Sequence, residues 1–177
     1  MLKRTPTTKA RFQLILIKPS HYDNDGYVVQ WLRSTMPSNS LAAVFSLAKG
    51  AAERELLGPD LPIDVMAMDE TNTRVKTKEI ARRIAENGGR GMVGIVGVQS
   101  NEFPRAVDIA RPLREAGVQV LIGGFHVSGC LAMLKELPGD IKAAQALGIS
   151  ERSVQRTWNA ATAWLRKEIG GDRLLEP

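Results

Sequence analysis

The chain has 177 residues, of which 44% are hydrophobic and 24% are charged, and its net charge is +5. This composition is sufficient for a folded core. The single cysteine, Cys130, excludes a disulfide framework, a four-cysteine zinc site and an iron–sulfur cluster held by cysteines of this chain. No apolar run reaches the roughly 20 residues needed to cross a membrane, and no secretory signal is recognisable, so a cytoplasmic protein is expected. Residues 12–137 carry 14 basic and 14 acidic side chains, so the excess charge is weak evidence for DNA binding.

Strand and helix patterns alternate from residue 12 to residue 137. The apolar run Phe12–Pro19 predicts a strand buried on both faces, and Ser38–Leu57 predicts a helix capped by Ser38 or Ser40. The further predicted elements are strands at 63–68, 91–98 and 118–122 and helices at 76–87 and 104–116. Four such repeats with short loops predict an α/β fold, a doubly wound parallel sheet with right-handed crossovers.

Ligands of such sheets bind beyond the carboxyl ends of the strands. Polar or glycine-rich segments follow the predicted strands at residues 20–26, 69–73, 99–101 and 123–128. The two histidines of the chain, His21 and His126, both fall in these segments. Each is a candidate metal ligand or proton donor, and a turn-holding role is the alternative for both.

Two acidic pairs lie at the same edge. Asp23 and Asp25 could act as acid and base, although aspartates in a loop that ends in glycine are typical turn formers. Asp69 and Glu70 are interpreted as a solvated rim or a helix-capping element. The chain has no Ser/His/Asp order, Walker-type loop or HExxH motif. The sequence therefore does not support an enzyme that works on its own, and no catalytic residue is assigned.

Two adjacent glycines, Gly123 and Gly124, follow the last predicted strand. Glycines at this place let a planar or phosphate-bearing group lie against bare backbone, although they also serve tight turns. They belong to a set of segments: Ile17–Tyr27, Pro37–Leu41, Asp69–Asn72, Gly97–Asn101 and Ile122–Cys130. Through this set, residues 12–137, about seven-tenths of the chain, resemble the N-terminal cobalamin-binding domain of cobalamin-dependent radical S-adenosylmethionine proteins.

The resemblance implies a flavodoxin-like, Rossmann-like sheet that holds cobalamin as its cofactor on the carboxyl edge. It implies that Gly123 and Gly124 flank the dimethylbenzimidazole tail of the cofactor, with His126 beside them. The other residues implied to contact the cofactor line the tail slot or face the lower side of the corrin. They are Gly97, Gln99, Ser100 and Asn101 for the slot, and His21, Asp23 and Gly26 for the corrin.

The chain departs from that family at three points. Better-known cobalamin domains carry Asp-x-His-x-x-Gly in the first loop, where the histidine ligates cobalt; aligned on Gly26, Asp23 takes its place, which leaves His21 as the candidate cobalt ligand. The usual Ser-x-Leu motif corresponds to Val96 and Val98, without the hydroxyl. The three-cysteine motif of the radical enzymes cannot be formed from one cysteine, so neither an iron–sulfur cluster nor radical chemistry is expected of this chain alone.

A different pattern follows Pro138. A short helix at 141–147, a turn at 148–150 and a capped helix at 151–169 are typical of a helix-turn-helix. This segment resembles the promoter-reading helix-turn-helix of extracytoplasmic-function sigma factors, although the polymerase-binding region of a sigma factor is absent. In that family the second helix enters the major groove. The residues implied to reach DNA are Ser150, Arg152, Ser153, Gln155, Arg156 and Asn159.

Three functions follow from these patterns. The leading hypothesis is a cobalamin-binding module that lacks the radical catalytic domain and works with a separate catalytic protein. The alternative is a cobalamin- or ligand-responsive transcription regulator that binds DNA or RNA polymerase, with a dimer as the form suited to specific binding. The third is a non-functional truncated hybrid. No membrane partner is expected. The expected division is a basic tail at 1–11, the α/β domain at 12–137, helix-turn-helix-like helices at 138–169 and a tail at 170–177.

Overall fold

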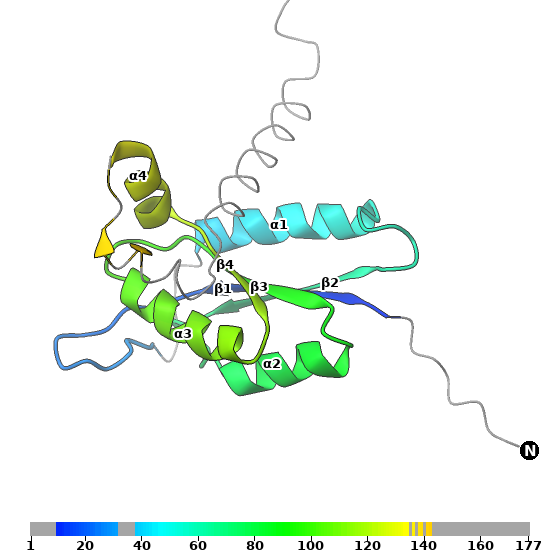
Figure 1. Ribbon diagram of the computed structural model, residues 1–177, viewed down its shortest axis with the longest axis horizontal. Helices are drawn as coiled ribbons and strands as arrows, with labels where there is room; N and C mark the ends of the chain where they lie inside the picture. Colours follow the sequence, from blue (N-terminus) through cyan, green and yellow to red (C-terminus); the bar gives the residue numbers. More distant parts are fainter. Residues whose placement is uncertain (1–9, 32–37, 135, 137, 140, 143–177) are drawn as a thin grey trace, which may run out of the picture.

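The computed structural model describes residues 10–31, 38–134, 136, 138–139 and 141–142. Strands and helices alternate through this part of the chain (Figure 1). The elements in order are β1 Phe12–Lys18, α1 Asn39–Glu53, β2 Ile63–Asp69, α2 Thr77–Glu86, β3 Gly91–Ile95, α3 Phe103–Glu115, β4 Gln119–Ile122 and α4 Phe125–Met133. The predicted α/β fold is confirmed.

The four strands form one parallel sheet in the order β2-β1-β3-β4. Strand β1 lies inside this sheet and pairs with β2 along its whole length, from Phe12 opposite Ile63 to Lys18 opposite Asp69. It also pairs with β3, and β3 pairs with β4. The order reverses between β1 and β3, and the chain leaves these two strands toward helices on opposite faces of the sheet (Figure 1).

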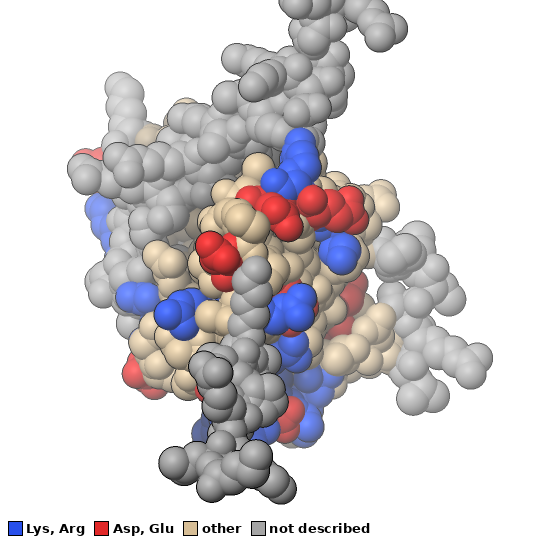
Figure 2. Space-filling view, turned by 90° about the vertical axis from the view of Figure 1, so that its right-hand side faces the viewer, with Lys and Arg blue, Asp and Glu red and all other residues tan. Residues whose placement is uncertain are grey.

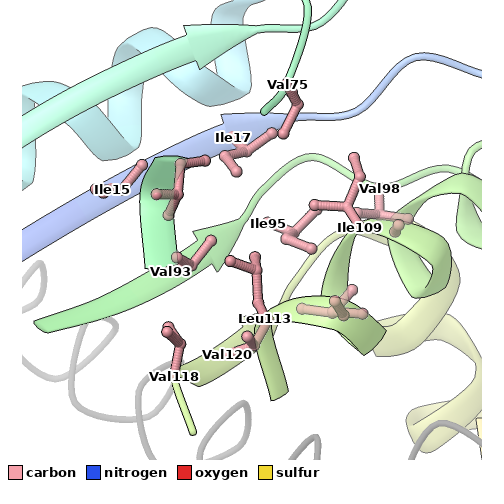
Figure 3. Packing of buried hydrophobic residues seen from close by; sticks show 14 of the residues in the cluster. Ile15, Ile17, Val75, Val93, Ile95, Val98, Ile109, Leu113, Val118 and Val120 are labelled. Carbon is pink, nitrogen blue, oxygen red and sulfur yellow. The ribbon is translucent and has the colours of Figure 1, made fainter. Parts of the chain in front are cut away.

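Helices cover both faces of the sheet because neighbouring residues of a strand point to opposite sides. Leu16 of β1 packs under α1 with Leu41 and Ala48. Its neighbours Ile15 and Ile17 are fully buried in the larger cluster on the other face, beneath α2 and α3. Figure 3 shows side chains from β1, β3, β4 and α3 pointing toward one another in that cluster. The prediction that the first strand is buried on both faces is confirmed.

The local signals at two helix starts are also confirmed. The hydroxyl of Ser38 accepts a hydrogen bond from the backbone N–H of Leu41 at 3.2 Å, which caps α1. Pro104 lies in the first turn of α3, where backbone N–H groups have no partner within the helix, so a proline costs no helical hydrogen bond.

Three predicted boundaries were wrong. Strand β3 stops at Ile95 rather than at Val98, because Gly97 (φ 66°) turns the backbone out of the sheet. Helix α1 stops at Glu53, four residues early, and a turn with Glu55 at φ 50° follows. Residues 125–128, expected as loop, form the start of α4. Only Val127 of that helix is buried, so no apolar periodicity marked it in the sequence.

Beyond α4, Ile141 is buried in the main cluster, so the core includes a residue past Leu137. The predicted helix-turn-helix spans 141–169, of which only 141–142 are described; the six residues predicted to contact DNA lie outside the described residues. In the part of the chain that is described, no helix is long and apolar enough to cross a membrane. Where side chains of that part are visible in Figure 2, basic and acidic groups are interspersed, in agreement with the charge balance of residues 12–137.

Candidate functional site

The candidate site is the edge of the sheet where the four parallel strands end. The connections after β1, β2, β3 and β4 all emerge there, and the loop after β1 projects beyond the strands on the left of Figure 1, with α4 above it. The residues implied to contact a cofactor lie in three of these connections, after β1, β3 and β4, except His126, which lies in the first turn of α4. The sheet thus brings residues 21–26, 97–101 and 123–126 to one edge of the molecule.

The glycine pair after β4 consists of two residues with different surroundings. A Cβ on Gly124 would lie 2.1 Å from the backbone nitrogen of Val98 and 2.5 Å from its carbonyl oxygen, and the φ of Gly124 is 151°. A Cβ on Gly123 would meet no atom within 4 Å. Gly124 is therefore required by the close approach of two loops, whereas Gly123 leaves bare backbone beside open space.

The loop after β3 is fastened on both sides. The N–H of Val98 donates to the carbonyl of Gly123 at 3.1 Å, and the carbonyl of Val98 accepts from the N–H of His126 at 3.1 Å. A Cβ on Gly97 would lie 2.8 Å from the Cβ of Ser40 in α1. Val96 is buried against α1. The backbone of this loop is thus held in place, while the side chains of residues 99–101 are exposed.

His126 and Ser100 meet across the edge. Nδ1 of His126 lies 3.1 Å from Oγ of Ser100, and the imidazole packs against Phe103 with ring centroids 4.7 Å apart. These contacts join the start of α4 to the loop before α3. Among the described residues, no group of three or more His, Cys, Asp or Glu side chains is arranged to hold a metal ion.

The loop after β1 contains a small antiparallel hairpin, residues 20–29, which we call the rim hairpin. Tyr22 and Val28 form a β-bridge, and the N–H of Val29 donates to the carbonyl of His21 at 2.9 Å. At the tip, Oδ1 of Asp23 accepts from the backbone N–H groups of residues 25 and 27, at 3.0 and 2.8 Å. Gly26, at φ 84°, completes the turn. Asp23 therefore has the role of a turn former, which the sequence also allowed.

Glu70 is the largest difference between the sequence interpretation and the structure. The sequence favours a solvated rim or a helix-capping role for Asp69 and Glu70. In the structure, however, Glu70 is buried, with 1% of its surface exposed. Arg105 of α3 holds its carboxylate: Nη2 donates to Oε1 at 2.6 Å, and Nε lies within 3.2 Å of both oxygens. The backbone N–H of Ser20 donates to Oε2 at 3.2 Å. Asp69, in contrast, accepts from the N–H and hydroxyl of Thr71, as a turn former does.

Arg105 extends this network to the rim hairpin. Its Nη1 donates to the hydroxyl of Tyr22 at 3.4 Å, and that hydroxyl donates to Oδ2 of Asp108 at 2.6 Å. The hydrogen bonds to Glu70 hold the pKa of Arg105 above its ordinary range. Burial, and then the hydrogen bond to Asp108, raise the pKa of Tyr22. The neutral phenol and the charged guanidinium are thus the stable forms in this network.

A second ion pair lies where the strand order reverses. Lys18, at the end of β1, pairs with Glu102 at the start of α3, and both side chains are largely buried. The other oxygen of Glu102 accepts from the N–H of Gln99 at 2.9 Å. Glu102 directly precedes α3 but makes no capping hydrogen bond to it, so its carboxylate is held by Lys18 and by the loop after β3.

Sequence reasoning did not assign five residues that organise this edge: Lys18, Tyr22, Glu102, Arg105 and Asp108. No spacing signal joins them, because the partners of each contact come from different elements. The one signal available was the acidic side chain of Glu70 directly after an apolar strand. Exposed aromatic side chains complete the edge: Tyr27 and Trp31 after β1, and Phe125 at the start of α4.

Comparisons of the chain with models of protein families, with curated proteins and with solved structures give no match.

Proposed function

We propose that the α/β domain is a cobalamin-binding module, which takes the cofactor on the carboxyl edge of its sheet. The observation that carries this proposal is Gly123: a residue without a side chain, at the end of a strand, beside space in which a Cβ would meet nothing within 4 Å. The tail group of the cofactor would lie there, against bare backbone.

The topology supports the same proposal. The order β2-β1-β3-β4 is that of the first four strands of a flavodoxin-like sheet, the fold that the sequence resemblance implies. In this proposal Gly97 and residues 99–101 border the tail slot, and the rim hairpin faces the lower side of the corrin. The cofactor supplies a redox-active cobalt, and the residues of the chain bind and orient it.

The ion pair between Lys18 and Glu102 argues against the main competing ligand of such a sheet. A mononucleotide at the reversal of strand order places its phosphate against the amino end of a helix. Here the carboxylate of Glu102, directly before α3, pairs with Lys18, and the first turn of α1 is capped by the hydroxyl of Ser38. A ligand whose flat group enters beside Gly123 needs neither position.

The exposed aromatic residues are compatible with a large, flat ligand. Trp31 is 64% exposed, and its backbone N–H donates to the carbonyl of Thr71 in the loop after β2. Phe125 is 79% exposed and lies after β4. β2 and β4 are the two ends of the sheet, three strand spacings or about 14 Å apart. A corrin lying over this edge would cover part of that apolar surface.

The test is retention of hydroxocobalamin by the purified full chain after desalting, followed by visible absorbance. We expect the parent to retain the cofactor with the spectrum of its base-off form, because the tail leaves the cobalt to enter the slot. Gly123→Val fills the open space and is expected to abolish retention while the protein remains folded. Gly50→Val is the matched control: a Cβ there also meets nothing within 4 Å, but Gly50 lies in α1, outside the connections that form the edge.

No retained colour in the parent, a base-on spectrum, or equal retention by Gly123→Val and the parent would each contradict this assignment.

A further inference from the structure

The rim hairpin is attached to the domain at its base. The carbonyl of Glu70 accepts from the side chain of Gln30 at 3.1 Å, and that of Thr71 accepts from the N–H of Trp31 at 2.7 Å. The hydroxyl of Ser20 donates to the carbonyl of Val29 at 2.5 Å, which closes the hairpin. These bonds tie both ends of the hairpin to each other and to the end of β2.

Farther out, the hairpin is fastened to α3 through the hydroxyl of Tyr22, which donates to Asp108 and accepts from Arg105. Arg105 contacts the carboxylate of Glu70 and the hydroxyl of Tyr22, so it joins the end of β2, helix α3 and the hairpin. The guanidinium carbon also lies 5.9 Å from the centre of the Tyr22 ring, within the range of a cation–π contact. Its planar group with several donors suits this bridging, which the single ammonium group of lysine cannot reproduce.

Stability alone does not account for this arrangement. Burying a carboxylate and a guanidinium carries a desolvation cost, and well-packed apolar side chains in the same volume stabilise a fold as well or better. An ion pair with two hydrogen bonds also fixes the relative orientation of its two side chains. Here it orients the residues that contact the hairpin, which is the part of the edge without a hydrophobic cluster of its own among the described residues.

We propose that Arg105 is a positioning residue of the cofactor site: by holding buried Glu70 and Tyr22 together, it keeps the rim hairpin in the one orientation in which residues 21–26 meet the lower face of the corrin. This inference rests on the proposed cobalamin binding. If only a fraction of the molecules has an ordered hairpin, the apparent dissociation constant for cobalamin equals the intrinsic constant divided by that fraction. The ordered fraction of the hairpin therefore predicts the affinity for cobalamin.

The experiment compares the parent with three variants of the full chain. Tyr22→Phe removes only the hydroxyl that Arg105 and Asp108 contact. Arg105→Lys keeps a positive charge beside Glu70 but cannot bridge to Tyr22. Arg111→Lys, at an exposed arginine of the same helix, is the matched control. Amide hydrogen exchange without ligand reports the order of the hairpin at residues 27 and 29, with the buried strand residue Ile95 as internal reference. Titration with hydroxocobalamin reports affinity.

We expect both hairpin variants to lose protection at residues 27 and 29 but not at Ile95. Where the ordered fraction falls to about one tenth, the dissociation constant rises about tenfold. The bound cofactor keeps the base-off spectrum of the parent, because the slot at Gly123 is untouched. Arg111→Lys is expected to match the parent in every measurement.

Two results would overturn the positioning role of Arg105 and leave the proposed function standing, provided that the parent binds cobalamin. In the first, the variants keep their hairpin protection; in the second, they lose it without a matching loss of affinity. Arg105→Lys also leaves buried Glu70 less well paired, so a general loss of protection that includes Ile95 would remove that variant from the comparison; Tyr22→Phe, which disturbs no buried charge, then decides the outcome. If the parent binds no cobalamin, the proposed function fails first and the positioning role fails with it.

Discussion

The two glycines after β4 are expected to respond in opposite ways to the same substitution. In Gly124→Ala the new methyl would lie 2.1 Å from the backbone nitrogen of Val98, and neither can rotate away because Cβ is fixed to the main chain and the nitrogen is part of it. The φ of 151° adds backbone strain of about 1–3 kcal/mol for a residue other than glycine. Overpacking adds about 1–3 kcal/mol, so the free energy of unfolding should fall by about 4 kcal/mol.

Gly123→Ala places its methyl in open space, in a backbone conformation outside the left-handed region. Its main effect is to reduce the freedom of the unfolded chain, so the free energy of unfolding should stay the same or rise by up to about 1 kcal/mol. Urea denaturation of the two variants and the parent, followed by far-ultraviolet circular dichroism, measures the difference. In a thermal scan, Gly124→Ala should unfold roughly 15 °C below the parent.

Equal losses of stability in the two variants would refute the reasoning, since Gly123 would then also be packed against neighbours. A stable Gly124→Ala variant would show that the loop after β3 does not approach β4 as closely as described. The first outcome would remove the open space that the proposed tail slot needs.

Two further predictions concern the core and the hairpin network. Leu113 of α3 is fully buried in the main cluster, so Leu113→Ala should lower the free energy of unfolding by about 3 kcal/mol in urea denaturation, and a loss below about 1 kcal/mol would contradict its core position. Because the pKa of Tyr22 is raised in the folded state above its ordinary value of 10.0, its contribution to stability is complete below that pH and is lost as the pH rises through the folded value. The stability of the parent should therefore fall more steeply above that pH than the stability of Tyr22→Phe, measured by urea denaturation at a series of pH values; identical slopes would contradict it.

Much of the fold could be predicted from the sequence because its signals are local. The run from Phe12 to Lys18 is apolar at successive positions, as a strand covered on both faces must be. Ser38 precedes a helical pattern and caps it. The elements that the sequence did not predict lack such local signals. Helix α4 buries only Val127, so it has no periodic apolar face that would indicate a helix. The turn at Gly97 depends on its close approach to Ser40, which sequence spacing does not encode.

For the candidate site, the sequence predicted the position in the fold but not the roles of the individual residues. Since parallel strands end at one edge, the sequence alone located the loops that hold His21, Gly97 and Gly123, and the cobalamin resemblance remains a prediction that the experiments above test. The roles of individual residues depended on distances between segments. The sequence favours a surface position for Glu70, whereas in the folded chain it is buried against Arg105, 35 positions away.

The sequence by itself determined the order of the four strands and of the three helices between them, and the edge at which the connecting loops gather, because each follows from residue type or from the spacing of near neighbours. Only the tertiary structure decided that Glu70 is buried, that Arg105 joins three elements and that Gly123 is open while Gly124 is packed. Those properties arise where distant segments approach to within a few ångströms, and side-chain burial and hydrogen bonding are settled at that range.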